Sequence, residues 1–246
     1  MTDRRSVLRA GTLAMAALAA SAGIPAANAA PPGPGSGAAG TAAGPADTPA
    51  QALERLRAGN DNWVNDRVTH PRATPTRRSD LSTHQEPFAV VFSCIDSRVP
   101  PELVFDQGLG DLMVVRTAAH TSDGLVAGSL EYGPAELGAR LLVVLGHQRC
   151  GAVTAAVKSF REGERLPGHL ADIARDLRAP YEEARRLGVP ADRLVEETVR
   201  AQTRRTVAQL RSDRLLCPLV RAGKLDVVEA YYSLDSGAVT FSTPGR

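Results

Sequence analysis

Two short segments of the chain carry side chains that bind transition metals. Cys94, Asp96 and Arg98 stand at alternate positions in the first segment, and His147 and Cys150 are separated by two residues in the second. Two thiolates, one imidazole and one carboxylate form a ligand set suited to a single tetrahedral Zn²⁺. Either pattern alone also fits an ordinary turn or core, but the two together predict a zinc site with one Zn²⁺ per subunit.

The residues in front of these two segments explain how distant side chains come to meet. Residues 88–92 and 141–145 are continuous apolar runs, each typical of a strand that is covered on both faces. Each run ends shortly before one of the ligand segments. Functional side chains in open α/β sheets gather at the carboxyl ends of strands. If the two strands are neighbours, the predicted ligands converge.

The rest of the chain alternates between strand and helix patterns. Further strands are predicted at 112–115 and 225–231, and Asp235-Ser236-Gly237 turns the chain into a last strand at 238–241. Helical patterns occupy 49–66, 128–137, 153–160, 170–187, 191–210 and 218–222. Gly59-Asn60 is expected to interrupt or bend the first helix, and residues 67–86 are expected to be loop. The alternation predicts an α/β fold with a central, mainly parallel sheet flanked by helices and a C-terminal edge hairpin.

Arg98 provides a means of opening the predicted zinc site. A closed shell of four ligands is usually structural, whereas a catalytic site keeps a position for water. Asp96 is the ligand expected to exchange, because a carboxylate binds Zn²⁺ less strongly than a thiolate. A bidentate pair with Arg98 would draw it off the metal. We therefore predict that Asp96 and Arg98 are the catalytic residues, the alternative being an ordinary surface ion pair.

The two ligand segments also resemble a known family. Cys94-Ile95-Asp96-Ser97-Arg98-Val99-Pro100, together with His147-x-x-Cys150-Gly151-Ala152, is closely similar to the β-class carbonic anhydrases. The resemblance runs from Leu56-Arg57-Ala58-Gly59-Asn60 to Asp235-Ser236-Gly237. It implies a zinc enzyme that interconverts CO₂ and bicarbonate through zinc-bound hydroxide, and a homodimer or higher homo-oligomer. The alternatives are a sibling zinc hydrolase acting on carbonyl sulfide or carbon disulfide, and a non-catalytic zinc- or bicarbonate-binding protein.

The resemblance implies roles for the metal-site residues. Cys94, His147 and Cys150 match the fixed zinc ligands. Asp96 matches a residue that is the fourth ligand in a closed state. In the open state it pairs with Arg98 and accepts a hydrogen bond from zinc-bound hydroxide.

Three further positions match the family's substrate pocket. Gln85 matches a residue that orients the substrate, and Met113 and Tyr132 match positions that line an apolar CO₂ pocket. Without the resemblance, each of the three is better explained as an ordinary loop or core residue.

Two departures from the family pattern stand out. Some relatives hold a non-catalytic bicarbonate with a Trp and an Arg, and here Arg116 matches the Arg but Val91 replaces the Trp. That form of regulation is therefore not expected, and the site is expected to be open at neutral pH. Ala119 and His120 stand where many relatives have Gly and Asn. A structural role is favoured for His120 over a role as proton relay.

The N-terminal region differs in composition from the rest. Arg4 and Arg5, an apolar stretch at 10–20 and Ala27-Asn28-Ala29 predict a twin-arginine signal peptide over residues 1–29. Export to the periplasm, cell wall or medium is expected, with no membrane anchor because the stretch is too short. Residues 30–49 are predicted to be a disordered Pro/Gly/Ala linker. Residues 50–246 are then expected to form the zinc-binding catalytic domain.

Composition excludes some partners. The chain of 246 residues has a formal charge of +2 and no basic block, so nucleic acid is not an expected partner. An exported protein with three cysteines would normally form a disulfide. Two of them, however, stand in ligand spacing, and Cys217 in its apolar context is expected to be a buried, inert thiol.

Overall fold

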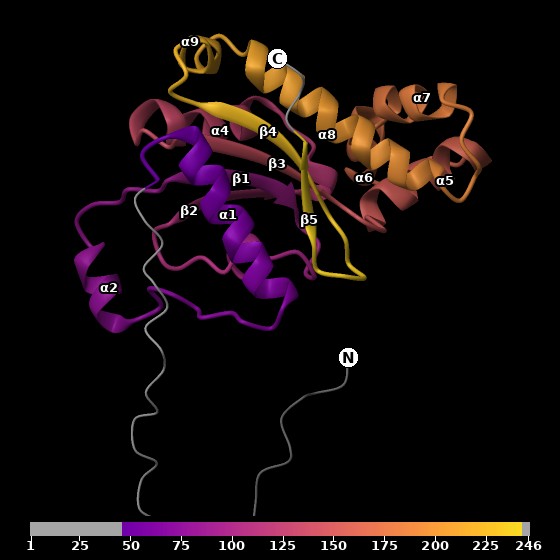
Figure 1. Ribbon diagram of the computed structural model, residues 1–246. Coiled ribbons are helices and arrows are strands. Elements are labelled where there is room, and N and C mark those ends of the chain that lie inside the picture. The colour runs from indigo at the N-terminus through magenta and orange to yellow at the C-terminus, as the bar shows by residue number, and fades with distance from the viewer. Residues whose placement is uncertain (1–45, 243–246) are drawn as a thin grey trace, which may run out of the picture. The chain divides into compact units, whose positions relative to one another are not determined.

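The computed structural model describes residues 46–242. The predicted signal peptide at 1–29 and most of the predicted linker lie outside these residues. A five-stranded sheet forms the centre of the described domain, in the order β2-β1-β3-β4-β5 (Figure 1). β5 pairs antiparallel with β4 and the other pairs are parallel, which confirms the predicted α/β fold and terminal hairpin. The strands are β1 Ala89–Cys94, β2 Leu112–Thr117, β3 Leu141–His147, β4 Asp226–Tyr232 and β5 Val239–Ser242.

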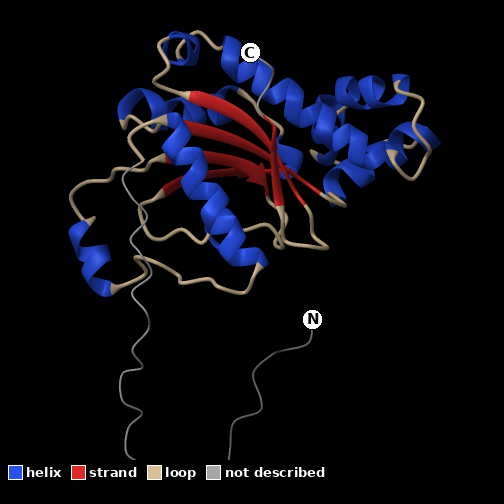
Figure 2. Ribbon diagram, in the orientation of Figure 1, coloured by secondary structure: helices blue, strands red, loops and turns tan. Residues whose placement is uncertain are grey.

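Helices cover both faces of this sheet (Figure 2). Val91 and Val143 pack in the cluster that contains α1, whereas Val90 and Val144 pack with α4 and α8. Side chains alternate along a strand, so runs that are apolar at every position bury both faces. No helix in the described part of the chain is long and apolar enough to cross a membrane. The helices are α1 Pro49–Val64, α2 Pro75–Asp80, α3 Pro101–Val104, α4 Gly124–Glu136, α5 Gly151–Glu162, α6 Leu170–Asp176, α7 Arg178–Arg186, α8 Leu194–Ser212 and α9 Leu216–Arg221, with a 3₁₀ turn η1 at Ala118–His120.

Capping residues and a proline explain why some helix boundaries differ from the predicted ones. α4 begins earlier than predicted, at Gly124, because the Asp123 carboxylate accepts hydrogen bonds from two backbone N–H groups of its first turn. The pattern at 170–187 forms two helices rather than one. Pro180 has no N–H to donate to the carbonyl of Asp176, and α6 ends there. The polar stretch before β1, predicted as loop, contains α2.

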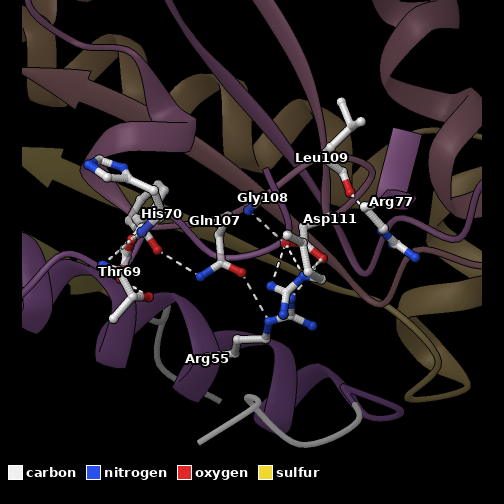
Figure 3. A network of polar contacts seen from close by, with 11 residues as sticks. Arg55, Thr69, His70, Arg77, Gln107, Gly108, Leu109 and Asp111 are labelled. Carbon is white, nitrogen blue, oxygen red and sulfur yellow. Dashed lines mark hydrogen bonds and ion pairs between the residues drawn. The ribbon is translucent and has the colours of Figure 1, made fainter. Parts of the chain in front are cut away.

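A polar network fastens α1 to the loop that leads into β2 (Figure 3). Arg55 donates from Nε to Gln107 Oε1 at 3.0 Å, and its Nη2 lies 2.7 Å from Asp111 Oδ1. Arg72 donates from Nε to the other carboxylate oxygen of Asp111 at 2.9 Å. The Asp111 side chain is only 6% exposed, and a buried charge needs such partners. The network therefore positions the start of β2 beside β1.

Gly59 and Asn60 do not interrupt α1, contrary to the expectation. A Cβ atom on Gly59 would lie 1.7 Å from the carbonyl oxygen of Phe105, so glycine permits a close approach of two backbones. The Asn60 side chain donates to the carbonyls of Val104 at 3.1 Å and Gly237 at 2.9 Å. The two residues thus attach α1 to α3 and to the C-terminal hairpin.

Replacement of Gly59 by alanine is expected to destabilise the fold. The added methyl group overpacks a backbone contact, and we expect a loss of about 2–3 kcal/mol in the free energy of unfolding. Gly128→Ala in α4 is the matched control, because nothing lies within 4 Å of its Cβ position. That variant should gain up to about 1 kcal/mol from helix propensity. Denaturant unfolding measures both, and equal stabilities of the two variants would contradict the packing argument.

Candidate metal centre

The two ligand segments lie side by side at the carboxyl edge of the sheet. β1 and β3 are neighbouring parallel strands, with Ser93 in register with Leu145. Cys94 is the last residue of β1, His147 is the last residue of β3, and Cys150 directly precedes α5. Parallel pairing therefore brings residues that are distant in the chain to one edge, as predicted.

Cys94, His147 and Cys150 form a compact group. Their ligand atoms all lie within 4.8 Å of one another, and the residues are 3%, 1% and 1% exposed. The two Sγ atoms are 3.8 Å apart. Two thiolates on one tetrahedral Zn²⁺, with bonds of about 2.3 Å, have their sulfurs about 3.8 Å apart. The donor set and its spacing therefore fit zinc.

The imidazole of His147 presents a free lone pair to this group. Its Nδ1 lies 3.0 Å from the backbone oxygen of Gln148. A carbonyl oxygen only accepts, so Nδ1 carries the proton and Nε2 has the lone pair. Nε2 is buried and has no hydrogen-bond partner among residues 46–242. An orphaned buried nitrogen of this kind is suited to a metal ligand, with the backbone oxygen fixing the tautomer.

Backbone amides lie close to the two cysteine sulfurs. Cys94 Sγ accepts a hydrogen bond from the Ala119 N–H at 3.3 Å, and Cys150 lies at the N-terminus of α5. The contact with Cys150 lowers the pKa of Cys94 to about 4, and the same contact, together with burial, raises the pKa of Cys150. Metal ligands must be deprotonated, so a divalent cation that binds both sulfurs would displace the proton of Cys150.

Asp96 lies beside the three ligands but is turned toward Arg98. Arg98 donates from Nε to Oδ1 at 2.9 Å and from Nη2 to Oδ2 at 2.7 Å. These hydrogen bonds lower the pKa of Asp96 to about 2, so the carboxylate is ionised at neutral pH. Its Oδ2 is 3.9 Å from His147 Nε2. The carboxylate is therefore next to the metal position and engaged by Arg98.

Comparison with known proteins identifies the family to which the chain belongs. The family model described as "Carbonic anhydrase" matches residues 89–239. The chain belongs to the β-class carbonic anhydrases.

Individual relatives match over most of their length. The chain is 38% identical over 194 residues to carbonic anhydrase 2 of Mycobacterium tuberculosis, which covers 78% of this chain and 92% of that protein. It is 39% identical over 196 residues to a carbonic anhydrase of Mycolicibacterium smegmatis, covering 79% and 94%. The fold is similar to that of tetrameric β-carbonic anhydrases from Sordaria macrospora, with a TM-score of 0.63 and 20% identity over 79% of this chain and 98% of that chain.

In this carbonic anhydrase, the Arg116 side chain binds the backbone of the first ligand segment, a role that the sequence motifs did not indicate. Its Nε donates to the carbonyl of Cys94 at 2.8 Å and its Nη2 to the carbonyl of Asp96 at 2.6 Å. The guanidinium therefore fixes the backbone of the ligand segment. Val91, which replaces the Trp of some relatives, is fully buried in the core that contains α1.

His120 is enclosed beneath the metal centre. It is 1% exposed, and its Nε2 lies 3.4 Å from Thr203 Oγ1. Burial lowers the pKa of His120 to about 3, so the ring is neutral near pH 7. A buried ring that does not take up a proton in this range favours the structural role over the proton relay.

The three predicted substrate residues do not join the metal residues of the same chain. Gln85 lies on an exposed loop before β1, and Met113 pairs with Val90 near the start of β1. Tyr132 of α4 precedes Gly133, whose Cβ position is 3.0 Å from the Met113 sulfur. All three therefore lie toward the amino edge of the sheet. β1 leads about 15–20 Å from that edge to the metal centre.

Cys217, the third cysteine, is a free thiol like the other two. It is partly exposed in α9 rather than buried as expected. It does not belong to the ligand group, which makes it a natural reference for variants of the other two.

Proposed function

We propose that this carbonic anhydrase catalyses the reversible hydration of CO₂ to bicarbonate and a proton, with Zn²⁺ held by Cys94, His147 and Cys150. The proposal is carried by one observation: the buried thiolate–imidazole–thiolate group lies beside a carboxylate that Arg98 turns aside. A structural site would use that carboxylate as a fourth ligand, whereas this arrangement leaves a position for water. When bound, Zn²⁺ acts as a Lewis acid that lowers the pKa of a water to about 7.

Asp96 and Arg98 orient the reacting water. An ionised carboxylate only accepts hydrogen bonds, and Asp96 Oδ2 is 3.9 Å from His147 Nε2, next to the metal position. By accepting a hydrogen bond from the water, Asp96 would direct a lone pair of the water oxygen at the carbon of CO₂. The other proton of the water passes to solvent, so the products are bicarbonate and one proton. Arg98 fixes both carboxylate oxygens, so the acceptor keeps its orientation.

A surface hollow of about 350 Å³ above these residues offers a place for the substrate. Ile95, Ala118 and Ala152 supply apolar lining, and Asp96 and Arg98 supply a polar side. A small neutral molecule such as CO₂ gains from the apolar lining, whereas the bicarbonate product is better solvated outside. Carbonyl sulfide and carbon disulfide are small and neutral too, so they are the competing substrates to test.

Asp96→Asn is expected to abolish most turnover while zinc is retained. The amide keeps the size of the side chain but presents a donor in place of an acceptor, and we expect kcat to fall by about 10²–10⁴-fold. Cys150→Ser should instead lose zinc, and Cys217→Ser should keep both zinc and activity. Stopped-flow CO₂ hydration with zinc quantification measures all three variants. Full activity of Asp96→Asn would contradict its role, and faster turnover of carbonyl sulfide or carbon disulfide than of CO₂ would contradict the substrate.

We propose further that a second copy of the chain supplies Gln85, Met113 and Tyr132 to the substrate pocket. Within one chain these residues lie toward the opposite edge of the sheet from the metal ligands. Gln85 is exposed and Tyr132 is 48% exposed, so both are available to another subunit. The homodimer predicted from the sequence would provide that subunit, and the relatives from Sordaria macrospora are tetrameric.

Mixed dimers test this arrangement. A Gln85→Ala chain keeps its zinc ligands and a Cys94→Ser chain keeps its Gln85, so a dimer of the two has one complete site if Gln85 acts across the interface. Random pairing of equal amounts should restore about a quarter of wild-type activity. Co-expressed chains assayed for CO₂ hydration provide the measurement, with each variant alone as control. No gain above the separate variants would show that Gln85 acts within its own chain or not at all.

We propose that residues 1–29 direct export through the twin-arginine route. Support comes from the order of Arg4-Arg5, the apolar stretch and Ala27-Asn28-Ala29. Export of a folded chain would allow zinc to bind Cys94 and Cys150 before they meet an oxidising compartment. N-terminal sequencing of the exported protein should begin near Ala30, and a chain that retains residues 1–29 after export would contradict the signal peptide.

A further inference from the structure

The segment between two zinc ligands contains a strained residue. Arg149 has φ +52°, in the left-handed region that residues other than glycine seldom adopt. This turn brings Cys150 back beside His147, so the strain lies within the metal centre itself. Such a conformation persists only where neighbouring contacts hold it.

Asp235, in the turn of the C-terminal hairpin, supplies those contacts. Arg149 donates from Nη1 to Asp235 Oδ2 at 3.0 Å and from Nη2 to Oδ1 at 2.6 Å. Gln148 donates from Nε2 to Oδ2 at 2.8 Å, and its Oε1 accepts from the backbone N–H of Asp235 at 3.3 Å. Both residues between His147 and Cys150 are therefore bound to one carboxylate.

The same turn is fixed from its other side by α1. Asn60 donates to the carbonyl of Gly237 at 2.9 Å and accepts from the N–H of Val239 at 2.8 Å. The side chain of Asn60 is buried, so these bonds are shielded from water. Asp235 thus projects from a turn that is anchored to the rest of the domain.

The contacts of Asp235 also extend to the catalytic pair. Arg98 donates from Nη2 to the backbone oxygen of Arg149 at 3.3 Å, with the same nitrogen that binds Asp96. A change in the backbone at Arg149 would therefore move an acceptor of Arg98. The conformation of the ligand segment and the orientation of Asp96 are coupled through this oxygen.

We infer that Asp235 is a positioning residue for the metal centre. Resting on the proposed zinc site, the inference is that the Asp235 carboxylate holds Gln148 and Arg149 in the turn that presents His147 and Cys150 to zinc. Through the Arg149 backbone oxygen it also steadies Arg98. Asp235 does not touch the metal position or the substrate hollow. It acts only through the residues that it binds.

The solvent exposure of the Arg149–Asp235 ion pair distinguishes a positioning role from a contribution to the stability of the whole domain. The side chains of Arg149 and Asp235 are 54% and 63% exposed, and ion pairs so exposed contribute little to global stability. Loss of Asp235 should therefore leave the unfolding of the metal-free protein nearly unchanged. The effect should be confined to the ligand segment, where zinc affinity reports it.

Asp61→Asn is a closely matched control for Asp235→Asn. Asp61 on α1 accepts from Asn65 and binds Arg67, as Asp235 accepts from Gln148 and binds Arg149. The side chains of that control pair are 62% and 60% exposed. Competition with a chelator measures zinc affinity, and thermal unfolding is followed with and without zinc. We expect Asp235→Asn to lower zinc affinity by about 10–100-fold and Asp61→Asn to leave it unchanged.

Substitutions at Arg149 separate its ion pair with Asp235 from the backbone strain. Arg149→Ala removes the ion pair and keeps a side chain in the left-handed region, whereas the hydrogen bonds between Gln148 and Asp235 remain. It should therefore lose zinc affinity, but no more than Asp235→Asn. Arg149→Gly removes the ion pair and the strain together, and its loss should be smaller than that of Arg149→Ala. Asp235→Glu, which keeps the charge, should recover part of the affinity.

Two results would overturn the inference. One is an Asp235→Asn variant with the zinc affinity of Asp61→Asn. The other is a fall in the unfolding temperature of metal-free Asp235→Asn that is large enough to explain its loss of zinc affinity. A wild-type chain that binds no zinc would refute the proposed function itself, so the two failures are distinguishable.

Discussion

Parallel pairing between β1 and β3 is the constraint on which the metal centre depends. The register places the ends of the two strands at one edge, and each strand ends in a zinc ligand. A slip of one residue would turn every side chain of a strand to the opposite face. The core prevents it, because Val91 and Val143 pack on one face while Phe92 and Val144 pack on the other. The hydrophobic burial that stabilises the sheet therefore also sets the ligand geometry.

The sharp turns of the chain at this edge place residues other than glycine in the left-handed conformation. Ala119 has φ +53° and His120 has φ +43°, and Arg149 in the second ligand segment has φ +52°. The resemblance to the family implies Gly and Asn at positions 119 and 120 in many relatives, and these residues adopt such angles most easily. The turn is useful because it directs the Ala119 N–H at Cys94 Sγ. Here the surrounding packing, not the residue type, must stabilise the conformation.

The ligand group and its place at the strand ends were predictable because both signals are local. Residue type shows which side chains bind zinc, and an apolar run shows where a strand ends. The contact of Asp235 with Arg149 spans 86 positions and leaves no local pattern. The same holds for Arg116, which binds carbonyls 22 and 20 positions away. Gln85, Met113 and Tyr132 were identified by resemblance alone, which carries no information about which edge of the sheet they occupy.

Charge balance explains why Arg98 accompanies Asp96 at this site. Two thiolates neutralise a bound Zn²⁺, and Arg98 neutralises Asp96, so the open arrangement has no net charge. If Asp96 joined the metal, the shell would become anionic and Arg98 would lose its partner. The cost to Arg98 would be modest because its side chain is 52% exposed and water can solvate it. The cost to the reaction would be greater, because Asp96 would occupy the position for water. The anionic ligand shell would also repel bicarbonate as it approaches for dehydration. Arg98 therefore favours the open site chiefly by keeping the Asp96 charge off the metal.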